Sequence, residues 1–291
     1  MEPTGTDGWG RVGAVRPPAA AGYFYSADPE VLRRELDWCY SHPLGPGPAR
    51  PEPPVAPIAV ISPHAGVQYS GPFAAHAYAR LGPVQAAVVL GPNHRGRGAP
   101  LALAPPIPWR TPLGDVPADP DLARLLLAEC PELEVDGRAH AAEHSVELQA
   151  IFLRHALGPD FRLVAIAVSG GRLAQALALG HALARASADR PVLLVASTDL
   201  SHYLPDTIAR ELDGRALAAI ERLDVEGLAR LLAADEAMLC GPVPTLAVLA
   251  AARELGARSA TLLRYGTSAD TGGGSDAVVG YAALRIDRPD G

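Results

Sequence analysis

The chain has 291 residues, 48% of them hydrophobic and 20% charged, and its formal net charge at pH 7 is -7. This length is enough for one large domain with a single core, and the excess of acidic groups argues against a nucleic-acid-binding protein, which would carry a basic stripe. Arg is the only basic residue besides His, so no lysine is available for a Schiff base or a phosphate-binding loop, and the abundance of Arg, Ala, Gly and Pro is typical of a GC-rich genome of bacterial character.

The predicted elements begin after a polar, Gly-rich N-terminus. We expect residues 1–14 to be disordered. Asp28 as the N-cap and Pro29 at the first helical position then predict a helix that continues through Tyr40. The Pro-rich stretch 43–54 predicts a loop, because it can hold neither a helix nor a strand ladder.

Beyond residue 54, apolar runs alternate with amphipathic stretches. The strands are predicted over residues 55–61, 85–90, 162–168, 192–196, 260–264 and 278–286. The helices are predicted over residues 70–81, 121–130, 143–157, 173–186, 206–222, 225–234 and 245–255. Continuous apolar strands of this kind are buried on both faces of a sheet that is at least partly parallel. The sequence therefore predicts, over residues 15–288, a single α/β domain with a mixed, largely buried sheet flanked by helices.

Three widely spaced cysteines, Cys39, Cys130 and Cys240, form no CxxC pair, which favours a reducing compartment over a disulfide framework. The N-terminus lacks the basic and apolar regions of a signal peptide. No apolar run approaches the roughly 20 residues of a membrane-spanning helix. We therefore expect a cytoplasmic protein that binds neither membrane nor nucleic acid. Cys39 and Cys130 lie in amphipathic helical patterns, where buried structural cysteines are expected.

A histidine follows the end of three predicted core strands. His64 lies in the segment Ser-Pro-His-Ala-Gly, His94 in Gly-Pro-Asn-His, and His202 in Ser-Thr-Asp-Leu-Ser-His. The carboxyl edge of the strands in an open α/β sheet is where ligand crevices form. Three histidines at this edge indicate that they converge on one pocket.

His64 and His94 are candidate imidazole ligands for Fe, Cu or Zn, and two histidines need at least one further ligand. Cys240 lies in the turn Met-Leu-Cys-Gly-Pro between two predicted helices, and its thiolate would be a strong soft ligand. Two other interpretations stay open at this point. Cys240 can be a small buried apolar residue, and each histidine can be a turn residue bonded to the backbone.

Asp199 and His202 form a D-x-x-H pair, which suits a general acid/base or a carboxylate that orients an imidazole. The alternative is that Asp199 caps nearby backbone amides. The stretch from His140 to His144 matches the H-x-x-E-H pattern of some zinc proteases, but Gly137 places His140 ahead of the helix. We instead expect a polar helix start that places His144 in the pocket, or a capped helix end that faces solvent.

The Gly-rich stretch 266–276 follows a predicted strand. It is interpreted as an anion-binding loop or as a surface loop, and the absence of a Walker lysine favours the surface loop.

Taken in order, these motifs resemble the Memo family over most of the chain. The resemblance is carried by Ala21-Gly22-Tyr23-Phe24-Tyr25, Ser62-Pro63-His64-Ala65-Gly66, Gly91-Pro92-Asn93-His94, Trp109-Arg110-Thr111-Pro112-Leu113-Gly114, Glu143-His144-Ser145-Val146-Glu147, Asp199-Leu200-Ser201-His202 and Cys240-Gly241-Pro242. Prokaryotic members are called the B protein of the AmmeMemoRadiSam system. AMMECR1-like and radical SAM proteins of that system are therefore the partners that the resemblance implies, beside a small-molecule or peptide substrate.

The resemblance also implies a fold similar to class III extradiol dioxygenases, which bind Fe(II) through two histidines and a glutamate. His64 and His94 then correspond to the two histidine ligands, and Cys240 stands where the carboxylate ligand is expected. His202 corresponds to the acid/base histidine, with Asp199 and His144 as further catalytic residues in the same pocket. A thiolate ligand changes the preference of the site, so that ring cleavage does not follow from the fold.

The expected function is that of a metal-dependent redox protein, a non-haem iron-dependent oxygenase, with Fe(II) as the expected metal and Cu or Zn as alternatives. A non-catalytic metal- or peptide-binding module is the first rival hypothesis. A metal-dependent hydrolase is the second.

Overall fold

Four strands made almost entirely of apolar residues form the centre of the structure. They are β1 (Ala59–Ser62), β2 (Ala86–Pro92), β5 (Arg162–Val168) and β6 (Val192–Ser197). The computed structural model describes residues 14–47 and 55–288. In it the four strands run parallel in the order β5-β2-β6-β1, and the residues of β1, β2 and β6 are all buried. Burial on both faces explains the continuous apolar runs in the sequence.

Shorter and antiparallel strands extend this centre on both sides. β3 (Leu101–Leu103) pairs antiparallel with β5 and parallel with β4 (Glu134–Val135). On the opposite side β9 (Val278–Ile286) pairs antiparallel with β1, β7 (His202–Leu204) and β8 (Thr261–Thr267). The described residues thus form one mixed nine-stranded sheet within a single α/β domain, as predicted.

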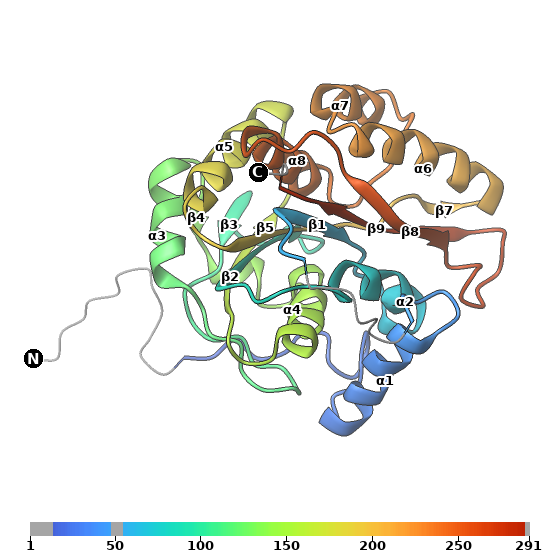
Figure 1. Ribbon diagram of the computed structural model, residues 1–291, viewed down its shortest axis with the longest axis horizontal. Helices are drawn as coiled ribbons and strands as arrows, with labels where there is room; N and C mark the ends of the chain where they lie inside the picture. Colours follow the sequence, from blue (N-terminus) through green and yellow to red (C-terminus); the bar gives the residue numbers. More distant parts are fainter. Residues whose placement is uncertain (1–13, 48–54, 289–291) are drawn as a thin grey trace, which may run out of the picture.

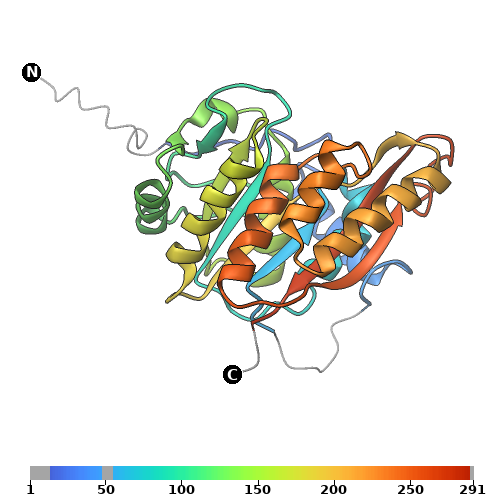
Figure 2. The same cartoon turned by 90° about the horizontal axis from the view of Figure 1, so that it is seen from above.

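Helices cover both faces of the sheet (Figures 1 and 2). The first face carries α3 (Pro120–Glu129), α5 (Leu173–Ser187), α6 (Asp206–Glu221), α7 (Val225–Ala233) and α8 (Pro242–Glu254). The second carries α1 (Pro29–Ser41), α2 (Val67–Tyr78) and α4 (Ser145–Leu157). Each face has its own core because successive strand residues point to opposite sides. In β2, Val88 packs with the first core and Val89 with the second.

Most predicted elements match the structure closely, and β5 and β9 have the predicted bounds. Asp28 caps α1, and Cys39 and Cys130 are buried, as expected. Two helices begin three residues before their predicted start, α2 at Val67 and α8 at Pro242. In both, a glycine is the N-cap, Gly66 before α2 and Gly241 before α8, and the helix starts directly after it.

The sequence did not predict three short strands. β3, β4 and β7 have two or three residues each, which is too short for a periodic pattern to show. The predicted disorder of residues 1–14 falls almost wholly outside the described residues, as does most of the Pro-rich stretch 43–54. Within the described part of the chain, no helix is long and apolar enough to cross a membrane.

The N-terminal segment, residues 14–25, is anchored to the first turn of α4 by a buried carboxylate. Glu147 accepts hydrogen bonds from the backbone N–H groups of Ala19 and Ala20, both at 2.8 Å, and from the Tyr25 hydroxyl at 2.5 Å. It also forms an ion pair with Arg16, and both side chains are almost fully buried. These four hydrogen-bond donors offset the free-energy cost of burying the charged carboxylate in a medium of low dielectric constant.

Replacing Glu147 tests how much this anchor stabilises the fold. We expect Glu147→Gln to lower the free energy of unfolding by about 3 kcal/mol, because it leaves the buried Arg16 charge without its counter-ion. Chemical denaturation measures the change. The control is Glu226→Gln, which removes an exposed ion pair. The side chains of Glu226 and Arg253 are 45% and 46% exposed, so this substitution should lower the free energy of unfolding by less than about 1 kcal/mol. Equal losses in the two variants would contradict the assignment.

Candidate metal centre

Three neighbouring strands bring the candidate site together. β2, β6 and β1 are adjacent and parallel, so that their carboxyl ends share one edge of the sheet. His64, His94 and Asp199 each lie two residues beyond the end of one of these strands. Segments distant in sequence therefore meet here because of strand order, as the strand-end pattern predicted.

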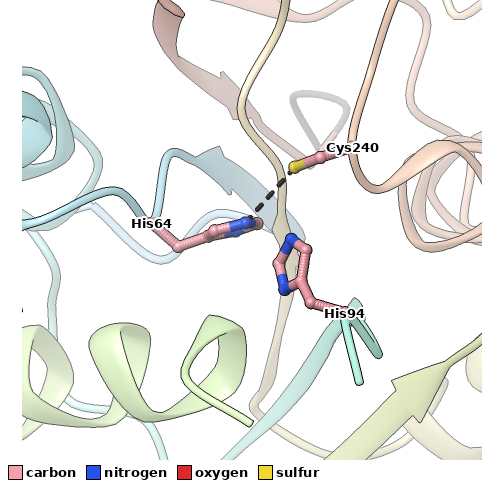
Figure 3. Close-up of side chains that lie close together, drawn as sticks. All are labelled: His64, His94 and Cys240. Carbon is pink, nitrogen blue, oxygen red and sulfur yellow. Dashed lines mark hydrogen bonds between the residues drawn. The ribbon is translucent and has the colours of Figure 1, made fainter. Parts of the chain in front are cut away.

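His64, His94 and Cys240 face one another across this edge (Figure 3). One ligand atom of each lies within 4.8 Å of the others. His64 Nε2 and Cys240 Sγ are 3.2 Å apart, and the centroids of the His64 and His94 rings are 5.2 Å apart. The spacing suits one ion held between two nitrogens and one sulfur.

The protonation of His64 follows from its neighbours. The Ser197 hydroxyl has one hydrogen, and it donates that hydrogen to the carbonyl oxygen of Ser145 at 2.8 Å. His64 Nδ1, 2.8 Å from Ser197 Oγ, must therefore carry a hydrogen and donate it. Burial first, and the nearby His94 second, lower the pKa of His64 to about 3, so that the ring is neutral. Its Nε2 is left with a free lone pair directed at Cys240.

A buried network holds Ser197 in place. Gln149 donates from Nε2 to Ser197 Oγ at 2.7 Å and to the carbonyl oxygen of Pro63 at 2.9 Å, and its Oε1 accepts the Tyr78 hydroxyl at 2.5 Å. The amide orientation is fixed because a carbonyl oxygen can only accept. The network runs from α2 through α4 to the end of β6 and fixes the ring of His64.

His94 is oriented by a carboxylate. Its Nδ1 lies 2.9 Å from Glu143 Oε1, and its backbone N–H donates to Oε2 at 2.6 Å. Burial opposes the charge of Glu143, but the hydrogen bonds from His94 and the Ser145 backbone hold its pKa at about 2. Since an ionised carboxylate only accepts, Nδ1 carries the hydrogen and Nε2 is the nitrogen left for a metal, the usual arrangement for a metal-binding histidine.

Cys240 lies just before α8. Its Sγ accepts the backbone N–H of Asp199 at 3.0 Å, and its own N–H donates to the Asp199 carbonyl at 3.1 Å. Burial, and then the charge of Asp199, raise the pKa of the thiol above its usual range. Gly241 permits this approach, because a Cβ there would lie 2.7 Å from the Ser197 carbonyl oxygen. A bound cation would favour the thiolate.

These residues fit a metal ion. His64 and His94 each use Nδ1 in a hydrogen bond, which leaves Nε2 for a metal, and one sulfur receives a backbone N–H bond and lies within reach of both rings. A donor set of two nitrogens and one sulfur suits Fe, Cu or Zn better than Mg or Ca, which prefer oxygen. The His94 side chain is 33% exposed, so the site is accessible from solvent.

His144 lies in the same pocket. Its ring stacks on His94 with centroids 4.6 Å apart and contacts His64 at 5.5 Å, while Phe24 of the N-terminal segment packs on it at 4.2 Å. Burial first, and the electrostatic interaction with the neighbouring His64 ring second, lower the pKa of His144 to about 4. The neutral His144 ring thus lies between the candidate ligands and Phe24. His144 directly precedes α4, so the polar helix start places it in the pocket as predicted.

His94, Glu143 and His144 form a second group whose spacing could hold a metal. The Glu143 carboxylate, however, is already bonded to His94 at both oxygens and accepts the backbone N–H groups of His144 and Ser145. This carboxylate caps the start of α4, where the helix dipole favours negative charge. Glu143 therefore serves better as an orienting group than as a ligand.

Asp199 reaches back to His64. Its Oδ1 accepts the His64 backbone N–H at 2.8 Å, and its Oδ2 lies 4.0 Å from His64 Nε2. Burial raises the pKa of Asp199. The Asp199 carboxylate thus accepts a hydrogen bond from a backbone amide, as the alternative interpretation expected. That amide belongs to the candidate ligand His64 and not to the start of a helix.

His202 begins β7 instead of lying in a plain loop. Its Nδ1 donates to the Leu200 carbonyl at 2.8 Å, so that Nε2 is its free nitrogen. The register of β7 against β9 shifts at this point, and Tyr203 adopts a φ of 59°, which is rare for a bulky residue. Among the described residues, no hydrogen bond joins His202 to Asp199; their charges interact at longer range.

A buried carboxylate from α6 holds the segment that carries Asp199 and His202. Asp213 Oδ1 accepts the Ser201 backbone N–H at 2.9 Å and its hydroxyl at 2.6 Å, while Oδ2 accepts the Tyr265 hydroxyl at 2.8 Å. Gly280 is required beside it, because a Cβ at that position would overlap the carboxylate. The segment is therefore fixed from both α6 and β9.

Two other predicted motifs lie away from these ligands. His140 Nε2 bonds the Ala102 carbonyl at 3.0 Å and joins no metal grouping, so the zinc-protease pattern is not assembled in the described residues. The Gly-rich stretch spans the end of β8 and the connection to β9, where Asp270 pairs with Arg210. That pairing fits the surface-loop interpretation better than the anion-binding one.

Sequence reasoning did not identify Ser197, Gln149 or Asp213 as site residues, and it used Glu143 only as part of a helix start. The one available signal was for Ser197, a hydroxyl at the end of a core strand. Gln149 and Asp213 are polar residues inside amphipathic helices, and nothing in their patterns distinguishes them from solvent-facing residues.

Fold and site together define a class of protein: a single-domain α/β protein with two histidines and a cysteine gathered at the carboxyl edge of its parallel strands. The family model described as Memo-like protein matches residues 16–285. The chain is 41% identical over 276 residues to a MEMO1 family protein of Methanopyrus kandleri, covering 92% of this chain and 98% of that protein.

A MEMO1 family protein of Ignicoccus hospitalis is 42% identical over 94% of this chain and 99% of its own length. A third, from Methanothermobacter thermautotrophicus, is 40% identical over 93% and 99%. The chain belongs to the Memo family. These relatives are archaeal, and they give no support to the bacterial origin suggested by composition.

Removing the Ser197 hydroxyl tests how His64 is held. We expect Ser197→Ala to weaken Zn(II) or Co(II) binding by about 10–100-fold, because His64 can then place its hydrogen on either nitrogen. Competitive metal titration measures the affinity, and ¹⁵N NMR of the metal-free protein reports the tautomer. Ser187→Ala is the control, since Ser187 Oγ is buried without a hydrogen-bond partner. An unchanged tautomer and affinity in Ser197→Ala would refute the argument.

Replacing Asp213 tests the support beneath His202. Asp213→Leu leaves three donors from Ser201 and Tyr265 without their acceptor, and we expect a loss of about 3 kcal/mol in the free energy of unfolding. Hydrogen exchange at residues 200–203 should also become faster. Glu211→Ala, which removes an exposed ion pair to Arg215 on the same helix, is the control with a loss below about 1 kcal/mol. Unchanged exchange in Asp213→Leu would show that β9 alone holds the segment.

Proposed function

We propose that this protein is a metal-dependent redox protein in which His64, His94 and Cys240 bind a divalent metal, first of all Fe(II), and that it acts as an oxygenase on a small or peptide-linked substrate. The observation that carries the proposal is the protonation pattern. Ser197 and Glu143 each accept a hydrogen bond from Nδ1 of one histidine. Both Nε2 atoms are therefore left to bind a metal beside Cys240 Sγ.

A bound Fe(II) would supply one-electron chemistry and coordination positions that the three protein ligands leave open. Around it the chain offers separate groups for proton transfer. His202 Nδ1 donates a hydrogen bond to the Leu200 carbonyl oxygen, so Nε2 is the atom that accepts or returns a proton. His144 is neutral because burial lowers its pKa to about 4. Two histidines with different environments can thus serve as base and hydrogen-bonding group.

Asp199 and Phe24 complete the arrangement. Asp199 bonds the backbone of His64 and, through its own backbone N–H, the sulfur of Cys240, so that it orients two of the three ligands. Hydrogen bonds to a ligating sulfur tune its metal's potential. Phe24 covers one side of His144 and limits the access of water there.

The test is metal analysis and oxygen uptake on protein purified anaerobically and loaded with Fe(II). We expect one iron per chain in the wild type. His64→Ala and Cys240→Ser should lose affinity by at least about 100-fold. Cys130→Ser is the matched control. Cys130 is buried in the hydrophobic core at the C-terminal end of α3, and it is not part of any group of described residues that could hold a metal ion. Iron binding that survives both ligand substitutions would refute the site.

The same samples distinguish the rival functions. Iron-dependent oxygen uptake with a pool of phenols or peptides supports the oxygenase. Tight metal binding without turnover on any pool supports a non-catalytic binding protein and contradicts the oxygenase. Selective zinc binding with hydrolysis of ester or amide probes supports the hydrolase.

A further inference from the structure

A cavity of about 660 Å³ lies between residues 22–27, one face of α1 and the first turn of α2, which packs beside α1 (Figure 1). None of the three candidate metal ligands lines it. Sites that hold small organic molecules have volumes of about 300–1,000 Å³. The cavity is therefore large enough for a ligand of its own, apart from the metal centre.

Four residues of α1 form the wall on that side of the cavity: Val31, Arg34, Glu35 and Trp38. The separations of three and four residues among them place their side chains along one face of the helix. Arg34 and Trp38 are both exposed, Trp38 to 41%, so that a molecule in the cavity can contact them. Because they are one helical turn apart, a guanidinium and an indole stand next to each other on this wall.

The positive charge of Arg34 has no counter-ion in the described part of the chain. The acidic side chains nearest to it along α1 are bonded to other groups. Their partners are Arg33 for Glu30, His155 for Asp37, and the Ser26 backbone N–H, at 2.9 Å, for Glu35. The N–H donors of the Arg34 guanidinium are thus left for a ligand.

The charges on the wall favour a carboxylate over a phosphate as that ligand. A guanidinium binds a carboxylate through two parallel N–H···O bonds, so that one arginine matches one negative charge. A phosphate monoester carries a charge of about -1.5 to -2 at pH 7. It would meet a single arginine with the Glu35 carboxylate on the same wall, and the repulsion from Glu35 would rise with the added charge.

We propose that this cavity binds a small aromatic carboxylate, whose carboxylate pairs with Arg34 and whose ring packs against Trp38. The exposed indole offers a flat apolar surface that an aromatic ring would cover. Phe24 also lines the cavity, and its ring packs on His144, so that the ligand lies beside the candidate metal centre and outside it. The binding needs neither a metal nor a reaction, so the proposal is independent of the proposed function.

Three probes with a common phenyl ring test this proposal: 3-phenylpropionate, its uncharged amide 3-phenylpropanamide, and phenyl phosphate. Isothermal titration of the metal-free full-length protein measures affinity, and ¹⁵N NMR follows the Nε–H of Arg34. We expect 3-phenylpropionate to bind about tenfold more tightly than the amide, because charge-assisted hydrogen bonds are about twice as strong as neutral ones. It should also bind more tightly than phenyl phosphate and shift the Arg34 resonance.

Three variants separate the contributions of charge and ring. Arg34→Gln should lower the affinity for 3-phenylpropionate to that for the amide. The matched control is Arg33→Gln, which removes the same charge from a side chain that is 50% exposed and does not line the cavity, and the preference should remain. Trp38→Ala should weaken both the carboxylate and the amide by at least about fivefold, because both share the ring.

Four outcomes would overturn the proposal. They are that no probe binds the folded wild type at millimolar concentration, that the amide or phenyl phosphate binds as tightly as 3-phenylpropionate, that Arg34→Gln keeps the preference, or that Arg33→Gln abolishes it equally. Circular dichroism of each variant establishes that it is folded, so that a loss of binding is assigned to the substituted side chain.

Discussion

The single hydrogen of the Ser197 hydroxyl is the constraint on which the candidate site depends. That hydrogen goes to the Ser145 carbonyl, so every other group around Ser197 Oγ must donate to it. Gln149 and His64 do so, from α4 and from the end of β1. One hydroxyl therefore sets the orientation of a buried amide, the tautomer of a candidate ligand and the approach of α4 to the sheet. Gly91 allows that approach, because a Cβ there would lie 2.5 Å from Ser145 Oγ.

The start of α4 uses two carboxylates for two different tasks. Glu143 accepts a hydrogen bond from His94 Nδ1 and fixes the orientation of that ring. Glu147 accepts hydrogen bonds from the backbone of the N-terminal segment and anchors it. Both carry negative charge near a helix N-terminus, where the helix dipole favours it. Arg16 joins the two regions, since it pairs with Glu147 and bonds the carbonyl of Glu143. The placement of Phe24 against His144 thus follows from an anchor outside the pocket.

Much of this architecture could be predicted from sequence because core strands leave continuous apolar runs. β5 and β9 were delimited correctly for that reason, and strand ends alone brought His64 and His94 to one edge. Cys240 was expected there mostly through the family resemblance, because its place in a turn left a small buried cysteine as an equal alternative. Ser197 and His64 are 133 residues apart, and Gln149 and Ser197 are 48 apart, so no local pattern records their contact. Strands of two or three residues were likewise invisible to periodicity.

The spacing of the site along the chain has a consequence for biosynthesis. His64 and Cys240 are 176 residues apart, and the two strands that flank β6 must be paired before their loops meet. A ribosome-bound chain that has not yet released Cys240 lacks the sulfur and carries only the two histidines of the candidate site. Because the candidate site is complete only when segments this far apart have met, the proposed metal binding would follow completion of the fold, and a metal that binds only the finished chain would stabilise it against unfolding.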